Sequence, residues 1–169
     1  MDDDRAIVAR QLGREPRAFR RVAVRCPFGR PAVTEQSPYD NAGDPFPTTY
    51  YLTCRHLVVA VSRLEAAGGV ERWTDAAEAD ADLRASLQRA TELQRDLRRE
   101  LAAGLIGRDD GASLELGIGG ASRPERLKCL HAHVAFGLAH PGYELGASIV
   151  GELDPLWPAR CCSASEPSG

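Results

Sequence analysis

The stretch FRRVAVRCPFGRPAVTEQ (residues 19–36) predicts a β-hairpin, around which the rest of the fold is expected to form. In its first half, Val22, Val24 and Cys26 alternate with arginine and alanine, which is typical of a strand with one solvated face. The proline and glycine residues of PFGRP (27–31) indicate a turn, and the residues after them form the return strand. We therefore expect two antiparallel strands, over about 19–26 and 31–37.

A third strand and a series of helices are expected further along the chain. The segment TTYYLTC is rich in residues that favour strands, so about 47–54 completes a three-stranded antiparallel sheet. Leucines at the helical period predict a long amphipathic helix between Asp80 and Leu105, with Arg98 among the arginines on its solvated faces. Further helices are predicted over residues 2–12, 55–69, 70–80 and 144–153.

One more helix is predicted from a local motif. Ser122 and Glu125 form a capping box with Pro124 in the first turn, and this helix is expected to run to about His140. Together these elements predict an α+β fold, in which a small antiparallel three-stranded sheet packs against four to six helices. We expect a single domain over residues 1–160, followed by a partly disordered C-terminal tail over residues 161–169.

Composition excludes several classes of protein. The chain has 169 residues, of which 43% are hydrophobic and 27% charged, as in globular proteins. Its apolar runs are far shorter than the roughly 20 residues that a bilayer span requires, so no membrane association is expected. The acidic start MDDDRAIVARQLG does not match a secretory signal. We therefore expect a cytoplasmic protein whose thiols stay reduced.

Charge is unevenly distributed along the chain. The net charge of −3 argues against a general affinity for nucleic acid. Between Arg14 and Arg30, however, six arginines stand against one acidic residue, Glu15. This basic patch suits an acidic protein partner or simple solvation, and it favours nucleic acid only weakly.

The segment KCLHAHVAF (128–136) places one cysteine and two histidines within five positions. In a regular helix, Cys129 and His133 are four residues apart and can converge on one atom, whereas His131 lies on the other side. Such residues also serve as packing groups, because a buried cysteine behaves as a small hydrophobe and a buried histidine bonds to its neighbours. A third interpretation is nucleophilic catalysis by a thiol–imidazole pair, either Cys129 with His133 or Cys54 with His56.

The other cysteines lie at the ends of predicted elements. Cys26 ends the first strand, and Cys54 ends the third strand where a helix begins. In a three-stranded meander, these two residues are expected at the same end of the sheet. Cys161 and Cys162 lie on a tail that could fold back over them. Four thiols from distant segments suit a tetrahedral metal site, with zinc favoured over an iron–sulfur cluster.

Three blocks of sequence, taken in order, resemble a known family: QLGREPRAFRRVAVRCPFGRPAV, PFPTTYYLTCRHLVVAVSRLEAAGGV and RLKCLHAHVAFGLA. They resemble the bacterial domain-of-unknown-function family numbered 501, which is common in actinobacteria. The resemblance covers roughly residues 6–161 and implies a stand-alone cytoplasmic protein. It implies thiols at Cys26, Cys54, Cys129 and at Cys161 or Cys162, with a histidine at His131. Helical spacing instead favours His133, so both histidines remain candidate ligands.

The leading hypothesis is therefore a metal-binding protein whose ligands come from separate segments. A structural metal would suit a protein that binds a partner, whereas an open coordination position would let the metal activate water. The alternatives are a cysteine-dependent enzyme with a Cys–His pair, and a module that binds nucleic acid or a protein partner through the Arg14–Arg30 patch.

Overall fold

The computed structural model describes residues 3–165, and its sheet contains the predicted hairpin. Strands β1 (Phe19–Arg25), β2 (Pro31–Gln36) and β3 (Tyr50–Leu52) form an antiparallel sheet in the order β1-β2-β3. Strand β3 is shorter than predicted because the ladder ends at Ala32, whose carbonyl accepts the amides of both Thr53 and Cys54. The predicted α+β fold with a three-stranded antiparallel sheet is confirmed.

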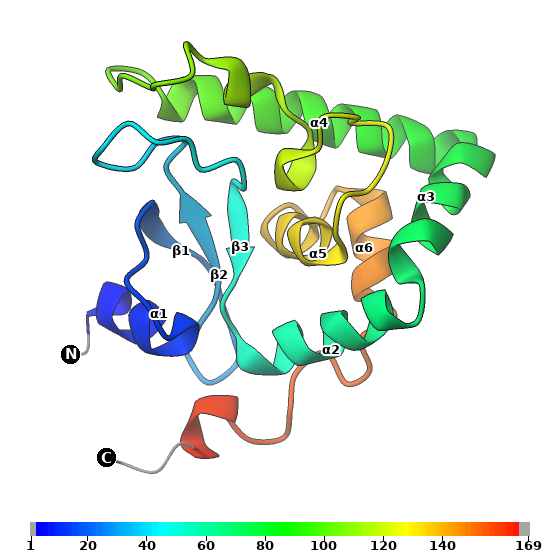
Figure 1. The fold of residues 1–169 in the computed structure, drawn as a ribbon. Coiled ribbons are helices and arrows are strands. Elements are labelled where there is room, and N and C mark those ends of the chain that lie inside the picture. Colours follow the sequence, from blue (N-terminus) through cyan, green and yellow to red (C-terminus); the bar gives the residue numbers. More distant parts are fainter. Residues whose placement is uncertain (1–2, 166–169) are drawn as a thin grey trace.

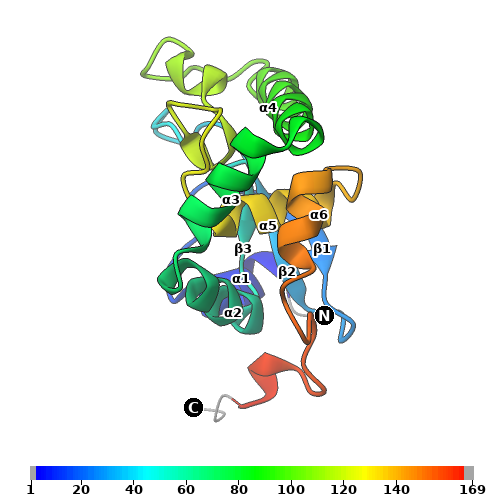
Figure 2. The same cartoon turned by 90° about the vertical axis from the view of Figure 1, so that its right-hand side faces the viewer.

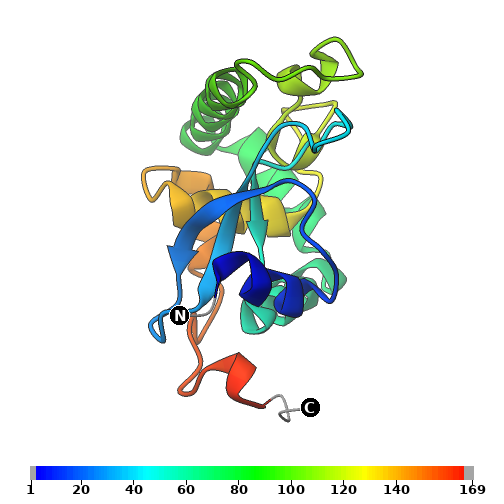
Figure 3. The same ribbon diagram turned by 90° about the vertical axis from the view of Figure 1, so that its left-hand side faces the viewer.

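Helices cover both faces of this sheet. Within the described residues, the α-helices are α1 (Asp4–Leu12), α2 (Arg55–Ala66), α3 (Gly69–Ala79), α4 (Ala81–Leu101), α5 (Leu130–Ala139) and α6 (Glu144–Val150), and the short 3-10 helices are η1 (Ala112–Glu115), η2 (Ile118–Gly120) and η3 (Cys162–Ser165). Helix α1 lies on one face of the sheet and α5 on the other (Figure 3). Helices α4 and α2 border α5 on opposite sides (Figure 1).

Helix α5 occupies the centre of the molecule (Figure 2). Seven of its ten residues are buried, including Leu130, Val134 and Phe136. It packs against β3, α2, α6 and η2, so apolar side chains on every side of the helix find a partner. A helix that is hydrophobic around its whole circumference is stable in water only when it is enclosed in this way.

The predicted start of α5 is wrong. The capping box of Ser122 and Glu125 does not open a helix, and α5 begins only at Leu130, after an extended Cys129 with φ −154° and ψ 152°. The Leu130 amide donates to the Glu65 carboxylate over 2.6 Å. A carboxylate near a helix N-terminus is stabilising, so this cap from the last turn of α2 replaces the local motif.

The long helix is confirmed, with one exception on its solvated faces. Asp80 caps α4 by accepting the amides of Asp82 and Leu83, and the helix ends at Leu101. Arg98 is not solvated as predicted, because its side chain is 0% exposed and faces Thr49, with 3.4 Å between Nη1 and Oγ1. Burial lowers the pKa of Arg98 to about 10.

The predicted tail is described only in part. Within it, η3 packs against α2 (Figure 1). Residues 166–169, for which disorder was predicted, lie outside the described residues. Among the helices of residues 3–165, none has both the length and the apolar character that a membrane crossing requires.

Helices α5 and α6 approach each other closely through two glycines. A Cβ atom at Gly137 would lie 2.9 Å from the carbonyl carbon of Gly146, and a Cβ at Gly146 would lie 2.4 Å from the Tyr143 ring. No other residue fits these positions without displacing backbone, so the glycine pair sets the distance between the two helices.

We expect Gly137→Ala to destabilise the protein by on the order of 1–2 kcal/mol, because overpacking of the helix contact outweighs the better helix propensity of alanine. Urea unfolding followed by circular dichroism measures this loss. Gly142→Ala is the matched control, since a Cβ there meets no atom within 4 Å. Equal stability of the two variants would contradict the proposed close contact.

Candidate functional site

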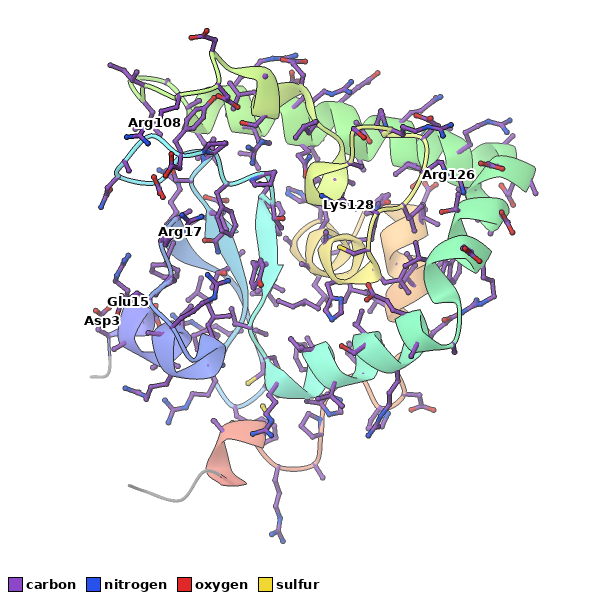
Figure 4. The ribbon with its side chains drawn as sticks, in the orientation of Figure 1. Asp3, Glu15, Arg17, Arg108, Arg126 and Lys128 are labelled. Atoms are coloured by element: carbon purple, nitrogen blue, oxygen red, sulfur yellow. The ribbon has the colours of Figure 1, made fainter. Side chains whose placement is uncertain are left out.

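Two thiols from distant segments meet at the N-terminus of α2. Cys54 follows β3 as the extended N-cap residue of α2, with φ −65° and ψ 118°. Cys162 begins η3, and its Sγ lies 3.7 Å from the Sγ of Cys54. Sulfur atoms are visible between the start of α2 and η3 (Figure 4). The tail therefore does fold back onto the end of the sheet, and it brings one thiol into contact with Cys54.

Burial governs the protonation of the Cys54 thiol. It raises the pKa of Cys54 to about 11, a shift that the neighbouring Cys162 increases and the backbone amides of Leu57 and His56 oppose. Cys54 is therefore a protonated thiol at neutral pH. A thiol in this state is a poor nucleophile, whereas a metal ion can displace its proton.

A cleft of about 410 Å³ lies beside the thiol pair. Its lining includes Arg10 of α1, Arg30 after the hairpin turn, Arg55 of α2, and Cys162. Three arginine side chains therefore share one cleft with the Cys162 thiol.

Two further predicted ligands lie near this end of the sheet. Cys26 is buried at the end of β1, where its amide donates to Arg30 and its carbonyl accepts from Gly29 in the hairpin turn. Cys161 is half-buried, with its Sγ 2.9 Å from the Ser163 Oγ. Within residues 3–165, however, no three side chains of His, Cys, Asp or Glu are grouped closely enough to hold a metal ion.

Cys129 does not join the other thiols. It precedes α5, whose first amide contacts Glu65 in the last turn of α2, whereas Cys54 precedes the first turn of α2. A helix of this length spans roughly 18 Å, so Cys129 and Cys54 lie at opposite ends of it. Burial raises the pKa of Cys129 as well. Cys129, one of the thiols that the family resemblance implied, therefore lies apart from Cys54.

His133 serves the core of the molecule. It is fully buried, and its Nδ1 lies 2.8 Å from the Tyr143 hydroxyl. Burial lowers the pKa of His133 to about 3, so the ring is neutral. The predicted alignment with Cys129 requires both residues to lie in one helix. Cys129 is extended and precedes α5, so this alignment does not occur.

His131 joins two helices instead of facing a thiol. Its Nδ1 lies 3.1 Å from the Glu65 carboxylate and its Nε2 lies 3.2 Å from the Ser62 hydroxyl, both on α2. The predicted pairing of Cys54 with His56 is also absent from the hydrogen bonds of the described residues, since the His56 Nε2 bonds to the Pro155 carbonyl over 3.0 Å.

Acidic neighbours neutralise much of the Arg14–Arg30 patch. Its ion pairs are Arg17 with Asp40, Arg20 and Arg21 with Glu35, and Arg25 with Asp4. Arg17 itself lies on the segment between α1 and β1 (Figure 4). Paired guanidiniums attract phosphates less than free ones, so the patch is a weaker candidate for nucleic-acid binding than its sequence suggested.

A polar row that was not predicted from the sequence crosses the sheet. Arg21 is the register partner of Glu35, and Glu35 is the register partner of Tyr50, so the three side chains are neighbours on one face. The Tyr50 hydroxyl then lies 2.9 Å from Nε2 of His140, which caps the C-terminus of α5. One feature of the sequence could have indicated this row: Glu35 is an acidic residue within a predicted strand.

We expect the buried His133 to make stability depend on pH. Its folded pKa of about 3 lies below the unfolded value of about 6.5, so the unfolded chain binds more protons between these values. The free energy of unfolding should therefore fall as the pH decreases from 7 to 5, by up to about 1.4 kcal/mol per pH unit from this group.

Chemical unfolding at several pH values measures this slope. His133→Gln should have a clearly smaller slope than the wild type, whatever its absolute stability. His56→Gln, which alters a histidine outside the core, should keep the wild-type slope. An unchanged slope in His133→Gln would show that the ring is not buried in its neutral form.

Comparison with known proteins identifies a family to which the chain is similar. A family model described as "Protein of unknown function (DUF501)" matches residues 22–153, which contain most of β1, the whole of β2 and β3, and α2 to α6. The match confirms the resemblance expected from the sequence. The thiols Cys161 and Cys162 lie outside the matched stretch. No curated protein and no solved structure matches the chain.

Proposed function

We propose that this chain, which belongs to the DUF501 family, acts through a paired-thiol site in which Cys54 and Cys162 bind a thiophilic metal ion, with zinc favoured over an iron–sulfur cluster. One observation carries the proposal: the two Sγ atoms lie 3.7 Å apart although the residues are 108 positions apart. Two sulfurs that bind zinc tetrahedrally at about 2.3 Å are themselves roughly 3.8 Å apart. The pair is therefore spaced as two ligands of one zinc ion.

The remaining coordination positions fall to neighbouring donors. Cys161 is adjacent to Cys162 in the chain, and Cys26 is buried at the same end of the sheet. Because the described residues contain no group of three such donors, a four-thiolate site requires Cys161 and Cys26 to turn toward the pair. His131 and His133 are engaged elsewhere and are not part of this proposal.

The metal would hold the C-terminal segment against the domain. It would bridge η3 to the N-terminus of α2, beside the cleft lined by Arg10, Arg30 and Arg55. Binding would release the proton of Cys54, whose affinity for it is high. A cytoplasmic location would keep both thiols reduced and available. The site would then fix one wall of this arginine-lined cleft.

A reversible disulfide between Cys54 and Cys162 is a second candidate. The observation in its favour is that the Cys54 and Cys162 thiols are in direct contact with each other. Rotation of the two side chains would bring the sulfurs to the roughly 2.05 Å of a disulfide. The two-electron oxidation would require a cellular oxidant such as a small disulfide, which would be reduced to two thiols.

Metal analysis of protein purified without oxygen tests the proposal. We expect about one zinc ion per wild-type chain and the loss of most of it in Cys54→Ser and in Cys162→Ser, because each change removes one of the paired ligands. Cys129→Ser is the matched control, since its thiol lies at the other end of α2 and should leave the zinc content unchanged.

Three results would contradict metal binding by this pair. Folded, metal-free wild-type protein with all thiols free would refute both candidates. Metal-free protein with Cys54 and Cys162 joined, seen by mass spectrometry without reductant, would favour the disulfide. Zinc that persists in both serine variants but is lost in Cys129→Ser would place the metal elsewhere.

A further inference from the structure

A serine, a histidine and a glutamate form a chain of hydrogen bonds where α5 meets α2. Ser62 and Glu65 are three residues apart on α2, so they lie on the same side of this helix. His131, the second residue of α5, lies between them. Its Nε2 is 3.2 Å from the Ser62 Oγ, and its Nδ1 is 3.1 Å from Oε1 of Glu65. A hydroxyl, an imidazole and a carboxylate linked in this order are the parts of a nucleophilic triad.

Glu65 determines which nitrogen of the His131 ring carries the proton. Its Oε1 also accepts the Leu130 amide over 2.6 Å, so this oxygen is held in place at the first turn of α5. An ionised carboxylate accepts hydrogen bonds and cannot donate one. The Nδ1 atom of His131 therefore carries the proton and donates it to Glu65. In the neutral ring, Nε2 then keeps a lone pair and accepts the Ser62 hydroxyl.

The surroundings of His131 also provide for a second proton on the ring. The Val58 carbonyl lies 3.3 Å from Nε2 and accepts a hydrogen bond from this atom once it is protonated. Both nitrogens of the imidazolium then face an acceptor, Glu65 at one and Val58 at the other. A base whose protonated form is stabilised in this manner can take the proton of Ser62 when the hydroxyl oxygen reacts.

The three side chains of this triad differ in their access to solvent. Ser62 is exposed, whereas the side chains of His131 and Glu65 are 29% and 26% exposed. A reagent therefore reaches the Ser62 Oγ from solution, while the ring beside it is held by contacts with α2. Val59, three residues before Ser62 on the same helix, is 42% exposed and offers an apolar surface next to the hydroxyl. This combination suits a small ester with an apolar acyl group.

We propose that Ser62 is an activated nucleophile that accepts the acyl group of a small ester. His131 is its general base, and Glu65 is the residue that positions the ring. None of the three belongs to the thiol pair, so the triad is a separate site.

Acyl transfer at this site proceeds through an acyl serine. The Ser62 O–H bond breaks, its proton moves to Nε2 of His131, and Oγ forms a bond to the carbonyl carbon of the ester. The bond from that carbon to the leaving oxygen then breaks and its electron pair stays on the oxygen, which takes the proton from Nε2 and departs as an alcohol. Water then attacks the acyl serine in the same two steps, which releases a carboxylic acid and restores the Ser62 hydroxyl.

Covalent labelling of the intact chain with a fluorophosphonate tests the nucleophile. In this reaction Oγ bonds to phosphorus, the P–F bond breaks, fluoride leaves and His131 takes the proton. We expect peptide mass spectrometry to find the phosphonyl group on wild-type Ser62, and Ser62→Ala to lose it. Ser148→Ala is the matched control and should keep it, since this exposed serine donates to the Glu144 carbonyl instead of to a histidine.

Phenyl acetate tests the ester reaction itself. We expect the wild type to release phenol at least about tenfold faster than Ser62→Ala, because general-base activation of the hydroxyl is lost with it. The two proteins have the same thiols and histidines, so the difference in rate reports on Ser62 alone. Circular dichroism checks that both are folded, and the exposed position of Ser62 in a helix favours a stable alanine variant.

Two further variants separate the base from the residue that positions it. Labelling of Ser62 should slow on the order of a hundredfold in His131→Gln and about tenfold in Glu65→Gln, whose amide oxygen can still cap α5. Nitrogen NMR should find the His131 proton on Nδ1 in the wild type, with a weaker preference in Glu65→Gln.

Four results would each refute the triad. They are an unlabelled wild-type Ser62, equal release of phenol by the wild type and Ser62→Ala, a folded His131→Gln variant that is labelled as fast as the wild type, and a wild-type His131 whose proton lies on Nε2.

Discussion

The burial of most of α5 is the constraint on which the rest of the structure depends. Because seven of its ten residues are buried, the sheet, α2 and α6 must each cover part of this helix. Its polar groups then need partners inside the protein: Glu65 caps the first amide, Tyr143 bonds to His133, and Tyr50 bonds to His140. Each of these contacts joins α5 to a different element, so enclosure of one helix fixes the positions of its neighbours.

Local patterns were sufficient to predict most of the fold. Strand alternation around Val22 and Val24, with a Pro-Gly turn after them, predicts the hairpin, and the leucine period predicts α4. The start of α5 could not be predicted in this manner. The capping box at Ser122 and Glu125 is a local signal, whereas the actual cap is Glu65 from another helix. Contacts between distant segments override local motifs where the backbone is buried.

The candidate sites show the same limit. The thiol pair was partly predictable. The sequence places Cys54 at the end of a strand, and the C-terminal tail was expected to fold back over that end of the sheet. The roles of His131 and His133 could not be predicted, because the spacing argument assumed a helix that already included Cys129. The polar row could not be predicted either. Its prediction would require the register of the three strands and the residue at which α5 ends.

The molecule therefore places its paired thiols at one border of its core, with Cys54 in the core and Cys162 packed against it. The thiol pair lies where the tail meets α2, whereas His131 and His133 hold neighbouring elements together. X-ray absorption at the zinc edge of the wild-type protein tests the central claim about the thiol pair most directly. We expect at least two sulfur neighbours at about 2.3 Å from the metal. A coordination shell made only of nitrogen and oxygen would contradict it.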